Sequence, residues 1–202
     1  SIPFQDSETA KNLLRAFAGE SQARNRYNFA ANLCQKQELQ AMAFIFQATA
    51  KQEQAHAKVF WDHLQALNGQ NLPIYGAYPI EGTNRILELL RAAQHNEHEE
   101  HGSVYPSFAA IATQEGFPEA AASFRQIAAI EQLHGERFGL LADQLESGAL
   151  FVSQIETGWM CLNCGHTQNS LEAPKQCPVC NHGQGWFIRL ELAPWSPVVK
   201  QT

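Results

Sequence analysis

Glu53-Gln-Ala-His56 and Glu131-Gln-Leu-His134 are two copies of one short pattern, Glu-x-x-His. On an α-helix this spacing puts both side chains on the same face, about 4.5 Å apart along the axis. Each copy can therefore present a carboxylate and an imidazole to a common point. One Glu-x-x-His alone is more often an ion pair on a helix surface, so the surrounding sequence has to decide between the two interpretations.

The surrounding sequence predicts four long amphipathic helices. Apolar residues recur every three or four positions through most of the first 148 residues. Asp6 or Ser7 can cap the first helix, and Pro118 suits the first turn of the last one. Gly102 and Pro106 should bend or interrupt the third helix. A connection containing Pro73, Gly76 and Pro79 is long enough to cross a bundle. The predicted ranges are 7–35, 38–67, 83–114 and 118–147.

Each predicted helix has an inward stripe that is apolar at both ends and ionisable near its middle. Bare carboxylates in a core are costly unless they are paired or bind a metal. One such interruption would mean little, but four at matching depth indicate a bound cation. The seven ionisable residues are the candidate metal ligands and the candidate catalytic residues: Glu20, Glu53, His56, Glu97, Glu100, Glu131 and His134.

This set of residues matches a two-metal site. One Glu from each of two helices and a Glu-x-x-His from each of the other two is the arrangement of di-iron carboxylate bundles. Glu20 and Glu53 are 33 residues apart and Glu97 and Glu131 are 34 apart, which predicts two similar helix pairs. Mixed carboxylate and imidazole ligands suit iron or manganese, with zinc or magnesium as structural alternatives. The one surplus carboxylate suggests that the coordination changes with oxidation state.

Several neighbouring residues have weaker assignments. Tyr27 and Tyr105 are candidate hydrogen-bond donors to ligand carboxylates, and the alternative is that they are ordinary core aromatics. Arg24 is expected to neutralise a buried carboxylate, and Cys34 to be a small core residue. Four histidines are expected at the surface or around the site and not as ligands: His63, His95, His98 and His101.

The C-terminal part contains two Cys-x-x-Cys pairs separated by twelve residues. This spacing is the signature of a tetrahedral four-thiolate metal site. Gly165 and Asn181 follow the second cysteine of each pair, where a positive φ is often needed. Spacing alone favours a zinc ribbon, but attachment to a di-iron bundle favours iron, because a redox cluster needs an electron entry point. The ligands are Cys161, Cys164, Cys177 and Cys180, and the small core is expected to contain Trp159, Trp186 and Phe187.

These features divide the chain into a helical bundle over 1–148, a linker over 149–157 and a small cysteine-containing domain over 158–202.

The net charge of −6 argues against a nucleic-acid partner. No apolar run is long enough to span a bilayer, and the N-terminal sequence lacks the pattern of a signal peptide. We therefore expect a protein of the cytoplasm that contacts neither nucleic acid nor a membrane.

Taken together, the motifs resemble those of the rubrerythrin family. The resemblance runs from Phe17-Ala-Gly-Glu20-Ser-Gln-Ala-Arg-Asn-Arg-Tyr27 to Phe187. It includes Glu97-x-x-Glu100-His101 with Tyr105-Pro106, and Glu131-x-x-His134-x-x-Arg137-Phe138. Asn181 stands where the family often has glycine, which bears only on fine tuning. The resemblance implies a mainly α fold, in which a ferritin-like four-helix bundle precedes a small rubredoxin-like four-cysteine β domain.

The resemblance also implies a function. It implies a non-haem di-iron peroxidase that reduces hydrogen peroxide to water and protects the cell from oxidative stress. Electrons would arrive from NAD(P)H through a rubredoxin reductase or rubredoxin, and then through the four-cysteine iron. Glu53 and Glu131 would bridge the two irons, and Glu100 would exchange for His56 on reduction. The other terminal ligands would be Glu20, Glu97 and His134, and the protein would be a homodimer.

Two other functions remain open on the sequence. One is ferroxidase or oxygen-reducing chemistry at the same site. The other is iron binding or storage, with a structural zinc ribbon in place of the redox iron. The sequence does not determine the electron donor or the preference for peroxide or oxygen. It also does not determine the metal in a given preparation or whether helices are exchanged between subunits.

Overall fold

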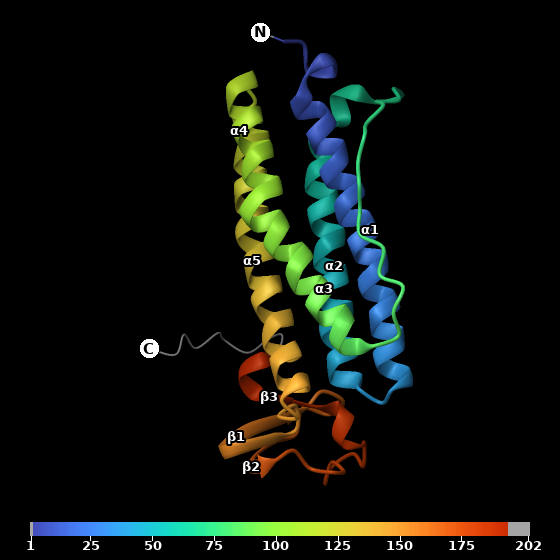
Figure 1. The fold of residues 1–202 in the computed structure, drawn as a ribbon, viewed down its shortest axis with the longest axis vertical. Helices are drawn as coiled ribbons and strands as arrows, with labels where there is room; N and C mark the ends of the chain where they lie inside the picture. Colours follow the sequence, from blue (N-terminus) through green and yellow to red (C-terminus); the bar gives the residue numbers. More distant parts are fainter. Residues whose placement is uncertain (1, 194–202) are drawn as a thin grey trace.

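The computed structural model describes residues 2–193, and five long helices make up most of them (Figure 1). Three of the predicted helices are confirmed to within a few residues, and the third is divided by a short π-helix. Ser7, and not Asp6, is the cap of the first helix, since its side chain accepts a hydrogen bond from the Ala10 N–H. The helices are α1 (Glu8–Lys36), α2 (Gln40–His63), α3 (Ile86–Glu99), α4 (Tyr105–Glu115) and α5 (Pro118–Glu146).

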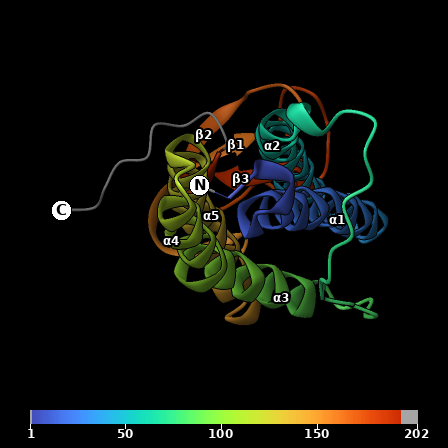
Figure 2. The same cartoon turned by 90° about the horizontal axis from the view of Figure 1, so that it is seen from above.

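The helices form two packed pairs. Helix α1 lies against α2, while α3 and α4 both lie against α5. Residues 68–85 contain neither helix nor strand, and they run outside α1 along the length of the bundle (Figures 1 and 2). This connection returns the chain to the end where α2 began, so α2 and α3 point the same way. The crossing that the sequence predicted is confirmed.

A π-helix (Glu100–Val104) joins α3 to α4, at the position where the sequence predicted an interruption. The Tyr105 N–H donates to the carbonyl of Glu100, five residues back, as a π-turn requires. Pro106 has no N–H to donate to the carbonyl of Gly102, so a regular α-turn cannot be completed here. The wider turn lets the chain continue in nearly the same direction and places Glu100 at a local irregularity.

Two apolar clusters fill the bundle, one on each side of the ionisable residues. One contains Tyr27, Phe46 and Phe138, and the other contains Phe60, Tyr105 and Phe124. Cys34 is completely buried in the first cluster, which confirms its assignment as a core residue. The ionisable middle of each stripe is therefore sealed between two hydrophobic layers.

The C-terminal residues form a three-stranded antiparallel sheet with the order β2-β1-β3, below the bundle in Figure 1. The strands are β1 (Val152–Cys161), β2 (Thr167–Glu172) and β3 (Phe187–Arg189). Trp159 and Phe187 are buried in its small core and Trp186 packs against them, as predicted. Strand β1 begins inside the range predicted as a linker, so only a few residues separate α5 from the sheet.

The small domain packs directly on the end of the bundle. Ile188 and Ala193 are buried in the same cluster as Met42 and Leu141. Gly185 lies so close to the turn between α1 and α2 that a Cβ added to it would be 1.7 Å from the carbonyl oxygen of Glu38. The two domains thus share a tight interface in this chain. Between residues 2 and 193, the helices are all too short or too polar to cross a membrane.

Candidate metal centres

Six of the seven predicted carboxylate and imidazole ligands form two overlapping groups in the bundle. Within each group the ligand atoms all lie within 4.8 Å of one another. Glu53 and Glu131 belong to both groups, as ligands that bridge two metal ions would. The first group adds Glu20 and His56 to these two, and the second adds Glu97 and His134.

The two histidines approach the shared carboxylates in the same way. Nδ1 of His56 lies 2.8 Å from Oε1 of Glu131 and 3.5 Å from Oε2 of Glu20. Nδ1 of His134 lies 2.9 Å from Oε2 of Glu131 and 3.1 Å from Oε1 of Glu53. The rings are nearly parallel, with centroids 5.8 Å apart. Each imidazole therefore directs the same nitrogen toward one of two adjacent points.

The converging atoms are buried and make no hydrogen bonds in spite of these short distances. Both carboxylate oxygens of Glu53 and of Glu131 lack a hydrogen-bond partner, and so does Nδ1 of each histidine. One oxygen of Glu20 and one of Glu97 are also without a partner. Unpaired buried polar atoms are expensive, and buried charges are normally paired or bound to metal. This donor set fits two cations that prefer mixed oxygen and nitrogen ligands.

An outer layer of hydrogen bonds holds three of the ligands. Tyr27 donates to Oε1 of Glu97, and Tyr105 donates to Oε1 of Glu20. Nε2 of His134 donates to Oε1 of Gln52 over 2.8 Å, which leaves Nδ1 free to bind a metal. Within the part of the chain that the structure describes, Nε2 of His56 and the carboxylate of Glu100 have no comparable partner.

Glu100 lies near the site but outside both groups. It is half-buried, whereas Glu20, Glu53, Glu97 and Glu131 are fully buried. The structure therefore brings His56, and not Glu100, to the first group of ligand atoms. Since Glu100 begins the π-helix, a small change in that turn would move its carboxylate relative to the other ligands.

The electrostatics of the cluster follow from burial and crowding. Burial raises the pKa of Glu53, Glu100 and Glu131 well above the ordinary range, and neighbouring carboxylates raise it further. Burial also raises the pKa of Glu97, but the close approach of the His134 imidazole and the hydrogen bond from Tyr27 outweigh that effect, and the net shift is downward. The same competition leaves the pKa of His134 raised, because nearby carboxylates favour its cation more than burial disfavours it.

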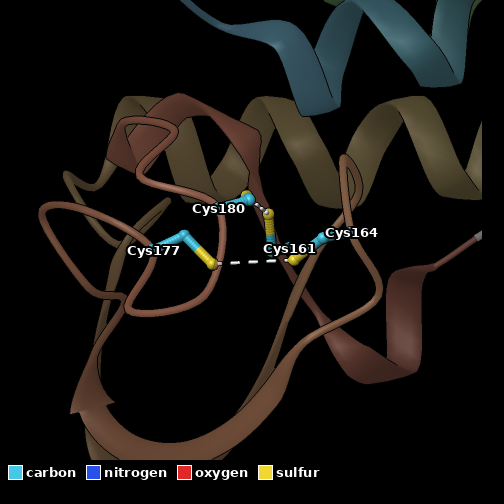
Figure 3. Close-up of side chains that lie close together, drawn as sticks. All are labelled: Cys161, Cys164, Cys177 and Cys180. Atoms are coloured by element: carbon cyan, nitrogen blue, oxygen red, sulfur yellow. Dashed lines mark hydrogen bonds between the residues drawn. The ribbon is translucent and has the colours of Figure 1, made fainter.

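The four cysteines of the small domain converge in a similar manner (Figure 3). Sγ of Cys161 lies 3.7 Å from Sγ of Cys180, and Sγ of Cys164 lies 3.7 Å from Sγ of Cys177. None of these cysteines forms a disulfide. Cys161 and Cys177 are buried, while Cys164 is exposed.

Two equivalent loops hold the cysteines. In the first, the Gly165 N–H donates to the Cys161 carbonyl, and in the second the Asn181 N–H donates to the Cys177 carbonyl. Gly165 and Asn181 have φ values of 78° and 63°, which confirms the predicted left-handed positions. The backbone N–H of His182 lowers the pKa of Cys180 to about 5. Such N–H donors stabilise thiolates and therefore the metal-bound form.

The structure also corrects and extends the list of neighbours. Arg24 is exposed and pairs with no carboxylate between residues 2 and 193, so the prediction that it neutralises a buried charge was wrong. The buried face of α1 passes through Ala23 instead. The prediction missed Gln52, because an exposed residue beside a ligand carries no periodic signal. No ligand group in this range includes His63, His95, His98 or His101.

Comparison with known proteins gives a consistent result. A family model described as rubrerythrin matches residues 11–142, and one described as the rubredoxin-like domain of rubrerythrin matches residues 159–188. The chain is 45% identical over 184 residues to rubrerythrin of Porphyromonas gingivalis, covering 91% of this chain and 90% of that protein. It is 40% identical to rubrerythrin of Nitratidesulfovibrio vulgaris, with 94% and 97% covered.

Solved structures show the same fold. Fully reduced, all-ferrous nigerythrin superimposes with a TM-score of 0.61 at 25% identity, covering 91% of this chain and 90% of that one. The bacterioferritin BfrA of Mycobacterium tuberculosis gives a TM-score of 0.61 at 18% identity, with 70% and 88% covered. At that identity the likeness to bacterioferritin concerns the fold alone, which is the ferritin-like bundle expected from the sequence.

Proposed function

Since this chain belongs to the rubrerythrin family, we propose that it is a non-haem peroxidase that reduces hydrogen peroxide to water. The family carries a di-iron site and a rubredoxin-type iron, and both sets of ligands are present here. The chain is accordingly an iron-binding oxidoreductase. We propose in addition that it prefers peroxide as oxidant, and we propose the source of its electrons and the role of each ligand below.

One observation carries the proposal: two ligand groups share Glu53 and Glu131. Two carboxylates common to both groups would let the cluster hold two metals close together. In this arrangement Glu20, Glu97 and His134 are terminal ligands, and His56 or Glu100 completes the remaining site. Iron held by these residues would supply the redox chemistry that the two-electron reduction of peroxide requires.

The protein's own residues position the ligands and exclude water. Tyr105 and Tyr27 fix the orientations of Glu20 and Glu97, and Gln52 fixes the ring of His134. The two apolar clusters keep solvent from the buried carboxylates. The reaction consumes one peroxide, two electrons and two protons and gives two waters. Glu100 is the half-buried carboxylate beside the site, so it is placed to pass protons inward.

The four cysteines would hold the iron that receives the electrons, and an NAD(P)H-dependent rubredoxin reductase or rubredoxin would supply them. Gln40 begins α2 at the end of the bundle on which the small domain packs, and Glu53 is 13 residues further along. At 1.5 Å per residue this separation is about 20 Å. A homodimer that brings the cysteines of one subunit near the carboxylates of its partner would shorten this path.

The test is rapid mixing of anaerobically reduced, iron-loaded protein with two equivalents of hydrogen peroxide, enough to oxidise all three irons, while the ferric-thiolate absorption is followed. We expect the colour to return promptly, and faster than with dioxygen. A faster response to dioxygen would favour an oxygen reductase or ferroxidase. A protein that stays colourless would indicate zinc or an empty site at the cysteines, and the relay would have to be abandoned.

A matched pair of variants isolates the relay. Cys161→Ser should abolish the ferric-thiolate signal and slow turnover with NADH and a reductase. A bundle that has been reduced chemically should still react with peroxide at the wild-type rate. Cys34→Ser changes the same atom at a buried position outside both sites, and it should leave the relay intact. Unchanged reductive turnover in Cys161→Ser would contradict the relay.

A further inference from the structure

A pocket of about 260 Å³ lies between the long connection and the bundle. Residues 75–78 of the connection form its outer wall, and Gly19, Glu100 and Tyr105 contribute to its inner wall. Two of these inner residues belong to the metal centre: Glu100 is a candidate ligand, and Tyr105 donates to Glu20. The pocket therefore reaches from the surface to Glu100 and Tyr105, at the edge of the carboxylate cluster.

Reciprocal hydrogen bonds fasten the outer wall to α1. Nε of Arg15 donates to the carbonyl of Tyr75 over 2.8 Å, and Oη of Tyr78 donates to the carbonyl of Arg15 over 2.7 Å. Both ends of the 75–78 segment are thus tied to a single residue of the bundle. The position of the Tyr78 ring is consequently fixed, although the segment contains no helix or strand.

The Tyr78 ring stands beside Glu100, over a glycine of α1. A Cβ added to Gly19 would lie 3.5 Å from Cε1 of Tyr78 and 4.0 Å from Oε1 of Glu100. The edge of the ring and the carboxylate therefore flank the same small space, which the absence of a side chain at Gly19 leaves open. Glu100 is a candidate ligand, so this space lies at the edge of the metal centre.

We propose that Tyr78 is a specificity-determining residue, whose ring limits the oxidant to one of the size of hydrogen peroxide. The inference rests on the proposed peroxidase function, because it concerns the substrate of the same site. An organic hydroperoxide would undergo the same cleavage, taking two electrons and two protons to give an alcohol and water. Its bulky group would have to pass between the Tyr78 ring and Glu100, and the ring prevents this.

The experiment compares reduced, iron-loaded wild type with Tyr78→Ala, Tyr78→Phe and Ile80→Ala. Rate constants are measured by rapid mixing with hydrogen peroxide and, separately, with cumene hydroperoxide. Tyr78→Ala should raise the ratio of the cumene rate to the hydrogen peroxide rate by on the order of tenfold, as expected when a pocket wall is removed. Ile80 is 96% exposed on the same connection, so Ile80→Ala is the matched control and should keep the wild-type ratio.

Tyr78→Phe distinguishes the contribution of the ring from that of its hydroxyl group. It retains the ring and loses only the bond to the Arg15 carbonyl. The bond from Nε of Arg15 to the Tyr75 carbonyl still holds the segment, so the ratio should stay close to that of the wild type. A ratio as high as that of Tyr78→Ala would overturn the assignment to the ring. Tyr78 is 39% exposed, so none of these changes opens the buried core.

A second measurement does not depend on turnover. The probe is pyridine-2,6-dicarboxylate, a planar chelator comparable in size to cumene hydroperoxide. It should remove Co²⁺ from the cobalt-substituted bundle faster in Tyr78→Ala than in the wild type or Ile80→Ala. Wild type that fails to reduce hydrogen peroxide would refute the proposed function itself. Wild type that reduces it, together with an unchanged ratio and an unchanged chelation rate in Tyr78→Ala, would refute only the role of Tyr78.

Discussion

The ligands of the carboxylate cluster differ in how firmly their outer atoms are held. Glu20, Glu97 and His134 each form a hydrogen bond to a side chain outside the cluster. His56 and Glu100 have no such bond within residues 2–193. Glu53 and Glu131 also lack one, but they belong to both ligand groups, whereas His56 belongs to one group and Glu100 to neither. A ligand fixed at its far side keeps one orientation, whereas an unfixed ligand can turn away at little cost. This difference gives a physical reason for the exchange of these two residues that the family resemblance implies.

Replacing Gln52 tests the role of the outer layer. Gln52→Ala removes the acceptor for Nε2–H of His134, so the affinity for one of the two metals should fall by about 10–100-fold. The imidazole N–H proton of His134 in the cobalt-loaded protein should also exchange faster with solvent. Calorimetric titration with Co²⁺ and proton NMR measure these two effects. Gln54→Ala, an exposed change on the same helix, should alter neither, and equal behaviour of the two variants would contradict the assignment.

At the scale of elements, α4 contributes a cap to a helix far away in the sequence. Both oxygens of Glu115, at the end of α4, accept hydrogen bonds from the start of α1. They bind the backbone N–H groups of Glu8 and Thr9, at 3.0 and 2.8 Å. Those N–H groups have no partner inside their own helix, and a carboxylate also interacts favourably with the positive end of the helix.

Glu115→Ala should lower the free energy of unfolding by about 0.5–2 kcal/mol, the usual effect of losing a cap. The bonds from Thr9 and Glu8 outweigh burial and hold the pKa of Glu115 below its ordinary value. The stabilisation is therefore present above the ordinary glutamate pKa and is lost as the pH falls through the lowered one. Urea unfolding at pH 7 and pH 3 should show the difference from wild type shrinking in acid. Glu136→Ala, at an exposed position, should be nearly neutral at both.

One close contact in the interface between the two domains requires a residue without a side chain. A Cβ at Gly185 would overlap the Glu38 carbonyl, and backbone atoms cannot rotate away. Gly185→Ala should therefore separate the small domain from the bundle and destabilise the protein by about 1–3 kcal/mol. We expect faster proteolysis between α5 and β1, with an unchanged ferric-thiolate spectrum. Gly183→Ala has open space around its Cβ and is the matched control; equal stability of the two variants would show that the contact is unimportant.

At the scale of the whole molecule, the cluster places charge where the fold would otherwise be apolar. The free energy of unfolding of metal-free protein should therefore depend on pH. The raised pKa values of Glu53, Glu100 and Glu131 mean that these groups destabilise the fold once the pH exceeds the ordinary glutamate value. The raised values of His56 and His134 add stability at low pH, which is lost as the pH rises through them. Both effects have the same sign, and the lowered pKa of Glu97, which adds stability above the ordinary glutamate value, opposes them.

Metal-free protein should consequently unfold at a lower temperature at pH 8 than at pH 5.5. A difference of about 1 kcal/mol corresponds to roughly 2–4 °C in a protein of this size. Metal-loaded protein should show a smaller difference over the same range, because bound cations neutralise the carboxylates. Calorimetry of both forms at the two pH values checks this. Metal-free protein that is more stable at pH 8 would mean that the carboxylates do not control the stability of the bundle.

The sequence by itself determined the helices, the sheet domain and the two groups of metal-binding residues. Local patterns carry this information: apolar periodicity defined the inward stripes, Glu-x-x-His put two donors on one face, and the cysteine spacing required two equivalent loops. Even the break near Gly102 and Pro106 followed from local chemistry, because proline lacks the N–H that a regular turn needs.

Only the tertiary structure decided which side chains meet across helices. It showed that Glu53 and Glu131 belong to both ligand groups, that Gln52 holds His134, and that Arg24 is exposed. It also placed Tyr78 beside Glu100 and Gly185 against Glu38. These contacts join residues far apart in the chain. Those within the bundle depend on the rotation of each helix about its axis, and those of Tyr78 and Gly185 depend on how the connection and the small domain pack on the bundle. That rotation is set by packing of the whole bundle, which no local pattern specifies.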